Sequence, residues 1–378
     1  MRFILLLAVL LLPARAGLAE PQIFASSSGD LKIETVAGGL VHPWSLAFLP
    51  DGRMLVTERP GRIRIVTRAG QLSPPLAGVP GVYAQSQAGL MDVMLGNDFE
   101  KNRTLYFCYA EPAEGGGGRI AVASARLEEN ARVPRLVAVT TIFRQRGPAS
   151  HGLNIGCRMV QASDGNLFVT LGDHFSAADM AQTLDNHIGK IVRIRPDGTA
   201  PPDNPFIDKP GALPEIWAYG LRNAEGLAFN PADGKLWEQE HGPQGGDEIN
   251  IIEKGKNYGW PKVSHGRNYD GTPVGTGKPR MAGMQDPLWH WTPSIAPSGM
   301  AFYTGELFPG WKGSLFNGAL KFELLSRLEL KGEQAVKEER LLQGLHERIR
   351  DVRQGPGGAL YLLTDNSAGR ILRVMPTK

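Results

Sequence analysis

Cysteine is scarce in this sequence of 378 residues, which contains only Cys108 and Cys157. Two cysteines cannot form a disulfide scaffold, so we expect a hydrophobic core, for which the 42% of hydrophobic residues supply the material. In an oxidising compartment the two thiols can pair, but the sequence does not place their Cα atoms within bonding range. A disulfide and two buried free thiols therefore both stay open.

The sequence also lacks an excess of charge of one sign. Its 41 Lys and Arg residues nearly balance 38 Asp and Glu residues, the formal net charge is +3 at pH 7, and no basic run occurs. Nucleic-acid binding depends on clustered positive charge, so we expect no nucleic-acid partner. Beyond the first residues no apolar run is long enough for a membrane-spanning helix.

Residues 1–19 are the one strongly apolar stretch. Arg2 precedes the run FILLLAVLLLPA, and small residues follow it. A single positive charge, a short apolar segment and an A-x-A-like end are typical of a secretory signal peptide, which is too short to span a bilayer comfortably. We expect cleavage after Ala16 or Ala19, so that residues 20–378 form an exported protein, periplasmic or secreted.

Glycine and proline, by contrast, are abundant, with 47 and 28 copies that favour many turns. One pattern recurs along the chain: a turn containing Asp-Gly or Pro-Gly, a strand of alternating apolar residues, a short polar break and a second strand. Its copies lie at residues 51–66, 101–127, 164–198, 233–240, 300–330 and 357–374.

Repeated units of roughly 40 to 60 residues, rich in β-branched and aromatic positions, predict an all-β fold. We expect a single six-bladed β-propeller over residues 20–378, with a strand at Ile33–Val36 closing the ring against the last unit. Because the spacing is irregular, two unrelated β domains are the alternative.

The segment from Leu221 to Trp260 concentrates polar chemistry. Arg222 and Asn223 offer a guanidinium beside an amide, and three carboxylates follow among glycines that free the backbone, namely Glu240, Asp247 and Glu248. This combination indicates a site for an anionic cofactor together with a hard cation such as calcium. The alternative is a solvated loop with charged turn residues.

Other candidates sit at the ends of predicted strands, where the loops of a propeller converge. Gln87 precedes one apolar strand, His151 and Asn154 precede another, and Asp173 ends a strand. A neutral histidine at a loop mouth can act as a general base, and a carboxylate can orient it. Taken singly, each of these residues is as compatible with an ordinary turn or cap.

Cations recur near the carboxyl end of the chain. Arg348 and Arg350 are two residues apart on a predicted strand, so their side chains share one face, and Lys321 adds a third cation. Such a patch suits a ligand with several carboxylates, although a solvated strand face is the ordinary explanation for each arginine alone.

Several motifs together resemble a known family. They are HPWSLAFLPDGRMLVTERPGRI, QAGLMDV, IGKIVRI, YGLRNAEGLAFNP, EHGPQGGDEIN, GKNYGWP and RIRDVRQGPGGALYLLTD. They closely resemble the pyrroloquinoline quinone-dependent soluble aldose sugar dehydrogenases, the glucose/sorbosone dehydrogenase family. The resemblance covers about residues 33–375 and implies a six-bladed propeller. It also implies an oxidoreductase that converts the C1 hydroxyl of an aldose to a lactone.

In that family hydride passes to the quinone, calcium polarises the quinone carbonyl, and electrons leave to an external acceptor. Residue by residue, the resemblance assigns quinone binding to Gln87, Arg222, Asn223, Lys321, Arg348 and Arg350. The carbonyls of Gly242 and Pro243 match the calcium site beside the cofactor, and Glu248 and the carbonyl of Tyr258 match a second, structural calcium site. Asp173 matches the carboxylate that supports the catalytic base.

The family's base is a histidine, and here the sequence departs from the pattern. A gap-free match to NIGCR puts Asn154 at the base position, and His151 lies three residues earlier. An amide cannot accept a proton near neutral pH, so either His151 supplies the base from a rebuilt loop, which we favour, or oxidation is weak or absent.

Two alternative functions follow. One is a non-catalytic, cofactor- or calcium-binding propeller of the same family. The other is a calcium-dependent lactonase, which the cationic cluster disfavours because a neutral lactone needs none. The physiological substrate, a sugar or another alcohol, and the state of the protein, monomer or dimer, stay open.

Overall fold

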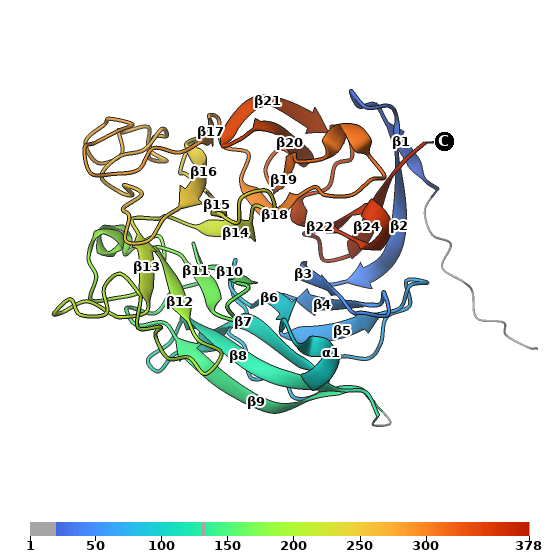
Figure 1. The fold of residues 1–378 in the computed structure, drawn as a ribbon, viewed down its shortest axis with the longest axis horizontal. Helices are drawn as coiled ribbons and strands as arrows, with labels where there is room; N and C mark the ends of the chain where they lie inside the picture. The colour runs from blue at the N-terminus through green and yellow to red at the C-terminus, as the bar shows by residue number, and fades with distance from the viewer. Residues whose placement is uncertain (1–19, 131–132, 378) are drawn as a thin grey trace, which may run out of the picture.

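The computed structural model describes residues 20–130 and 133–377. The predicted signal peptide, residues 1–19, lies outside this part of the chain. Six antiparallel sheets are arranged around a central axis as the blades of a β-propeller, which confirms the predicted fold (Figure 1). The described residues contain no helix with the length and apolar character needed to cross a bilayer.

The blades follow one another along the chain. Blade one consists of β3 (Pro43–Phe48), β4 (Met54–Glu58) and β5 (Arg62–Val66). Blade two consists of β6 (Leu90–Leu95), β7 (Thr104–Pro112), β8 (Gly118–Glu128) and β9 (Arg135–Arg144). Blade three consists of β10 (Gly156–Gln161), β11 (Leu167–Leu171), β12 (Lys190–Ile194) and β13 (Ile216–Tyr219).

The remaining blades keep this order. Blade four consists of β14 (Ala224–Phe229), β15 (Leu236–Glu240), β16 (Asp247–Ile252) and β17 (Trp289–Trp291). Blade five consists of β18 (Pro297–Phe302), β19 (Leu315–Ala319), β20 (Leu324–Lys331) and β21 (Gln334–Leu341). Blade six joins β22 (Ile349–Gln354), β23 (Leu360–Thr364) and β24 (Gly369–Pro376) to β2 (Leu31–Leu40) and β1 (Gln22–Phe24). In the part of the chain that the structure describes, helix is limited to α1 (Phe99–Asn102) and the short 3₁₀ turns η1 (Ala178–Gln182), η2 (Pro309–Trp311) and η3 (Pro356–Gly358).

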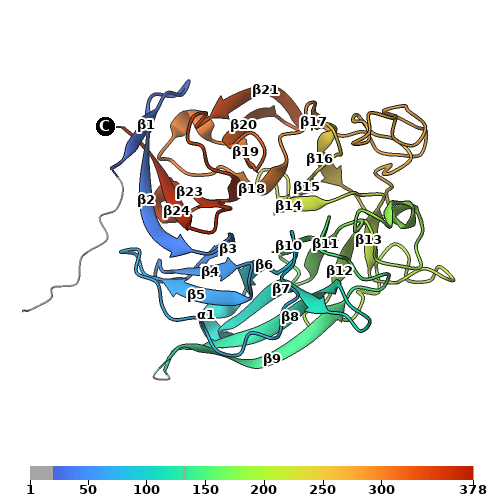
Figure 2. The same ribbon diagram turned by 180° about the vertical axis from the view of Figure 1, so that it is seen from behind.

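The ring is closed by the amino-terminal strand. β2 pairs antiparallel with β24, with Ile33 opposite Val374, so the predicted closing strand at Ile33–Val36 is confirmed and is longer than expected. In both views the first strands lie beside the last one (Figures 1 and 2). Blade six is thus built from strands of both ends of the chain.

The hydrophobic core is divided among the seams between blades. One apolar cluster fills each seam; Leu55 and Phe107, for example, pack between blades one and two. Between blades two and three, Cys108 in β7 and Cys157 in β10 form a disulfide with Cα atoms 5.9 Å apart. Of the two states that the sequence leaves open, the structure has the disulfide.

The predicted site residues come together at one end of the propeller because of the directions of the strands. In each blade the innermost strand begins at the end where the antiparallel second strand stops. Loop residues just before β6, β10, β14 and β22 therefore meet residues just after β11, β15, β19 and β23. The Asp-Gly turns, such as Asp51-Gly52 and Asp164-Gly165, lie at the opposite end.

Candidate active site

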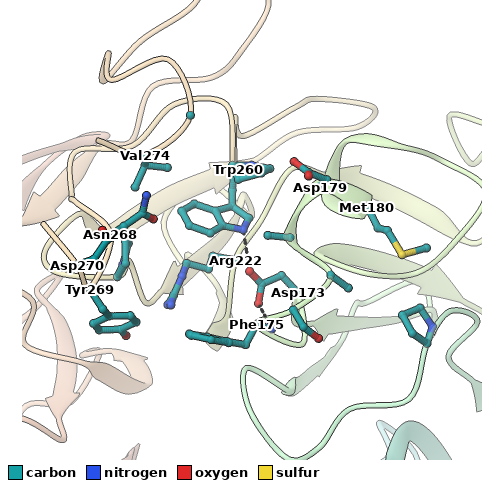
Figure 3. A pocket seen from close by; sticks show the side chains of 17 residues that line it. Asp173, Phe175, Asp179, Met180, Arg222, Trp260, Asn268, Tyr269, Asp270 and Val274 are labelled. Carbon is teal, nitrogen blue, oxygen red and sulfur yellow. Dashed lines mark hydrogen bonds between the residues drawn. The ribbon is translucent and has the colours of Figure 1, made fainter. Parts of the chain in front are cut away.

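A pocket of about 820 Å³ opens at this mouth between blades three and four. Asp173, Arg222 and Pro243, three of the residues predicted from the sequence, line it together with Trp260 (Figure 3). The long loop between β16 and β17 forms part of its wall. The loop residues at the wall are Asn268, Tyr269, Asp270, Val274 and Gly275.

Asp173 lies two residues after the end of β11, and both of its carboxylate oxygens accept hydrogen bonds. Oδ1 accepts hydrogen bonds from the Asn154 side-chain amide and from the backbone N–H of Phe175, each at 2.8 Å. Oδ2 accepts one from the indole N–H of Trp260, also at 2.8 Å (Figure 3). The backbone N–H of Asp173 donates to the carbonyl of Arg222.

Burial raises the pKa of the Asp173 carboxyl above its ordinary value, because the charged form loses its hydration. The Arg222 guanidinium and the hydrogen bonds that the carboxylate accepts oppose this rise. Asp173 is therefore a buried, well-positioned carboxyl that borders the pocket. Perturbed groups of this kind concentrate at functional sites.

Arg222 spans the floor of the pocket. Its guanidinium donates to the carbonyls of His241 and Gly242, at 3.1 and 2.8 Å, and lies 5.2 Å from the ring of Trp260. A Cβ on Gly242 would lie 2.2 Å from the carbonyl oxygen of Gly245, so this turn excludes a side chain. Its backbone can therefore present carbonyl oxygens to the site.

Two predicted amides hold the loop that carries Asn154. Gln87 accepts the backbone N–H of Asn154 through Oε1 at 2.8 Å. Asn223 accepts the backbone N–H of Gly156 through Oδ1 at 2.9 Å. The structure thus joins Gln87, Asn154, Asp173 and Asn223 in one network, although they come from four separate loops.

The carboxyl-terminal arginines meet at Asp365. Arg350 is buried, donates to Asp365 at 2.8 Å and also pairs with Glu225. Arg348 lies 3.7 Å from the same carboxylate and is half-exposed. The two arginines therefore share Asp365, but Arg348 precedes β22 and Arg350 is neutralised by Glu225 and Asp365, so they do not form the open two-armed patch predicted for one strand face. Burial alone would raise the pKa of Asp365, but Arg350 and its hydrogen bond outweigh it and hold that pKa well below its usual range.

The remaining predicted residues stand apart from the pocket wall. Lys321 is exposed and follows Leu320, whose carbonyl accepts the guanidinium of Arg348. His151 is exposed and makes no side-chain hydrogen bond within the described part of the chain. Asn154, by contrast, is 5% exposed and faces Asp173.

Sequence reasoning missed other residues at the mouth. The His42 Nδ1–H donates to Asp365 at 2.8 Å, the Trp260 indole N–H donates to Asp173, and Glu225 pairs with Arg350. His42 immediately precedes β3, as Asn223 immediately precedes β14, and Gln87 lies three residues before β6. That positional rule was a usable signal for His42; nothing in the sequence gives the partner of Trp260.

A second cluster of buried acids lies on one face of β15 and β16. Glu240 is opposite Glu248 and Glu238 is opposite Asn250, so four polar side chains share that face. Burial raises the pKa of all three carboxyls, and their mutual repulsion adds to the rise for Glu238 and Glu248. One oxygen each of Glu238 and Asn250 has no hydrogen-bond partner.

Tyr258 is buried, and its hydroxyl donates to the carbonyl of Ile251 at 2.7 Å. Within residues 20–130 and 133–377, no three His, Cys, Asp or Glu side chains converge as a ready metal centre. A cation at either predicted site would therefore need backbone carbonyls or the Asn250 amide among its ligands. Oxygen donors of these kinds are the ones that calcium accepts.

Comparison with known proteins gives the family. The glucose / sorbosone dehydrogenase family model matches residues 40–373. The aldose sugar dehydrogenase YliI of Escherichia coli (strain K12) is 44% identical over 353 residues, 93% of this chain and 94% of that protein.

Two solved structures agree with this match. The soluble aldose sugar dehydrogenase from Escherichia coli, in its apo form, has a TM-score of 0.88 at 43% identity and covers 92% of this chain and 100% of its own. The aldose sugar dehydrogenase from Streptomyces coelicolor in its PQQ-bound form has a TM-score of 0.76 at 30% identity over 91% of this chain and 98% of its own. The chain described here belongs to the glucose/sorbosone dehydrogenase family.

Proposed function

We propose that this protein is an exported dehydrogenase that oxidises the C1 hydroxyl of an aldose and uses pyrroloquinoline quinone (PQQ) as its oxidant. The observation that carries the proposal is the pocket in which the buried carboxyl of Asp173 lies beside the Arg222 guanidinium and the Gly242-Pro243 turn. A pocket with a few convergent polar groups and a perturbed carboxyl is the usual form of a small-molecule active site.

The cations at the mouth fit a planar ligand with three carboxylates. Arg222 lines the pocket, and Lys321 and Arg348 are open to solvent, so all three can pair with an anion. Arg350 is already paired with Glu225 and Asp365, and we assign it to support of the site from below. The quinone, when bound, supplies the acceptor for hydride from C1.

Calcium is proposed for two places. Beside the quinone, we assign calcium to the backbone carbonyls of Gly242 and Pro243. Pro243 lines the pocket, and the Gly242 carbonyl also accepts a hydrogen bond from Arg222. The charge of a cation there would polarise the quinone. In blade four, the unpaired oxygens of Glu238 and Asn250 next to Glu248 lack a compensating positive charge. A hard cation satisfies such a group of buried oxygens.

The rim of the pocket fits a sugar. Phe175 and Tyr269 are 50% and 58% exposed, and their rings stack with centroids 6.2 Å apart. Phe175 has a φ of 65°, a left-handed conformation that is costly for a bulky residue and is more often found at functional positions. Exposed aromatic faces beside the polar side chains of Asn268 and Asp270 suit a ring with both apolar C–H faces and hydroxyl edges.

Reconstitution tests the proposal. Apo protein is titrated with PQQ in calcium and assayed with a panel of aldoses, alcohols and lactones, using an artificial dye as electron acceptor. We expect quinone binding, aldose-dependent dye reduction and lactone formation. Arg222→Ala should weaken quinone binding by roughly tenfold or more, because one charge-assisted contact is lost. Absence of quinone binding by the wild-type protein would refute the proposal.

Two results would favour the alternative functions. Quinone binding without turnover of any alcohol would indicate a non-catalytic binding protein, which the position of Asn154 opposite Asp173 makes the more serious alternative. Hydrolysis of a lactone without quinone would indicate a calcium-dependent lactonase.

Export is proposed from the amino-terminal sequence and the disulfide. A bond between Cys108 and Cys157 persists in an oxidising compartment, which supports a periplasmic or secreted location. Cell fractionation followed by amino-terminal sequencing should find the mature chain outside the cytoplasm, beginning after Ala16 or Ala19.

A further inference from the structure

Oxidation of an aldose at C1 requires a group that takes the hydroxyl proton, and the structure restricts the choice. The Asn154 amide is engaged as a donor to Asp173 and has no basic atom to offer. His151 is exposed and does not border the pocket. Asp173 is the buried carboxyl that borders it.

We infer that Asp173 itself takes the proton from the C1 hydroxyl, and that Asn154 is a positioning residue that aims the carboxylate. The inference rests on the proposed dehydrogenase function. It assigns to the carboxylate the task that a histidine at position 154 would otherwise perform.

Hydrogen-bond counting identifies the reactive oxygen. Each carboxylate oxygen has two lone pairs that can accept. Oδ1 already accepts from Asn154 and from the backbone N–H of Phe175, so its lone pairs are used. Oδ2 accepts from Trp260 alone and keeps one lone pair for a substrate hydroxyl. Figure 3 shows the carboxylate between Trp260 and Phe175, beside Arg222.

The charges around Asp173 suit this role. Arg222 faces it from the loop before β14, and Glu240 repels it from the end of β15. His174, its neighbour in sequence, is buried and neutral near pH 7, and the acids Asp179 and Asp270 lie farther around the pocket wall. Burial raises the pKa of Asp173, which strengthens it as a base while Arg222 keeps it ionisable.

The reaction balances with an ortho-quinone as the oxidant. The O–H bond of the C1 hydroxyl breaks and its proton goes to Oδ2 of Asp173. The C1–H bond breaks and its electron pair leaves with the hydrogen as hydride to the quinone. The C1–O bond becomes a carbonyl, so the cyclic aldose becomes a lactone, the quinone gains two electrons, and Asp173 later releases its proton to solvent.

A double-mutant cycle on the quinone-loaded protein tests the inference. The rate of quinone reduction by a saturating aldose is measured in single turnovers for the wild type, Asp173→Asn, Asn154→His and the double variant. We expect Asp173→Asn to reduce the wild-type rate by about 10²–10⁴-fold, the usual contribution of a general base. In the Asn154→His background, the factor by which Asp173→Asn lowers the rate should be at least tenfold smaller, because the new histidine can accept the proton.

The pH profile separates a base from a merely structural carboxylate. The acid limb of the wild-type rate should follow ionisation of Asp173, and in Asn154→His it should move toward the range of a histidine. A second readout needs no turnover: the infrared pH-difference spectrum of the apo protein should contain a carboxyl band that is absent in Asp173→Asn. Melting curves and quinone titrations of each variant establish that it is folded.

Several results would overturn the inference. One is an Asp173→Asn rate within tenfold of the wild type, and another is an equal cost of Asp173→Asn in both backgrounds. A third is a decrease in the rate of quinone reduction in His151→Ala as large as that in Asp173→Asn, which would identify His151 as the base. Failure of the wild type to reduce its quinone with any aldose would instead refute the proposed function, so the two failures are distinguishable.

Discussion

At the scale of single residues, His174 has a measurable consequence for stability. Its Nδ1–H donates to the carbonyl of Pro148 at 3.0 Å, and its Nε2 is buried without a partner. Burial lowers its pKa from 6.5 to about 4. At a pH between 6.5 and 4, this histidine is protonated in the unfolded chain but neutral in the folded protein. The free energy of unfolding therefore falls as the pH falls from 6.5 to 4.

We therefore expect His174→Gln to flatten the acid side of the stability profile. Wild-type protein should lose up to about 3 kcal/mol more than the variant between pH 7 and pH 4, from the shift in this pKa. Urea unfolding at a series of pH values measures the difference. His151→Gln is the matched control, because that histidine is exposed and its replacement should leave the profile unchanged. Parallel profiles for wild type and His174→Gln would contradict the prediction.

Residue-scale prediction depended on the resemblance to a known family, because a carboxylate or a guanidinium taken singly is equally compatible with an ordinary turn. The resemblance singled out Asp173 and Arg222, and both residues line the pocket. The bond from Trp260 to Asp173 joins residues 87 positions apart, and no local pattern specifies it. The partnership between Asn154 and Asp173 likewise needed the fold, since the amide could have faced either way.

At the scale of elements, the acid face of β15 and β16 predicts a calcium effect. This face buries three glutamates together, Glu238, Glu240 and Glu248. Removing the negative charge of one of them should lower the affinity for a cation bound there. Saturating calcium should raise the melting temperature of the wild-type protein by about 5 °C, the size expected from binding at about 100 times the dissociation constant. Glu248→Gln should reduce this increase by about half or more.

Scanning calorimetry with calcium and with a chelator makes the measurement. Glu253→Gln is the control, because this glutamate follows β16 and is exposed. Equal calcium responses of Glu248→Gln and the wild type would place any calcium effect elsewhere in the molecule. The turns and alternating strands of the sequence predicted these elements. Glu240 and Glu248 lie directly across from each other on β15 and β16. This pairing depends on the strand register, which the sequence pattern does not determine.

At the scale of the whole molecule, stability depends on closing the ring. Blade six is completed by β2, whose residue Ile33 is 4% exposed and packs among the apolar side chains between blades five and six. The apolar cluster between blades five and six includes side chains from both ends of the chain, namely Leu31 and Ile33 beside Leu372 and Val374. The sequence predicted the closing strand, because a propeller has no other use for an isolated strand before its first blade.

Ile33→Ala should lower the free energy of unfolding of the whole protein by about 2–4 kcal/mol, the usual cost of a buried isoleucine truncation. Ile23→Ala, in the adjacent strand β1, should change it by less than about 0.5 kcal/mol, since Ile23 is 55% exposed. Urea unfolding followed by tryptophan fluorescence measures both free energies.

Quinone affinity measured at the same urea concentrations shows when the distant quinone site is lost. If ring closure makes the protein unfold as one unit, quinone binding by Ile33→Ala is lost at a lower urea concentration, together with the fluorescence transition. A shift of the fluorescence alone would show that the seam opens locally and that the site is stable without the closing strand.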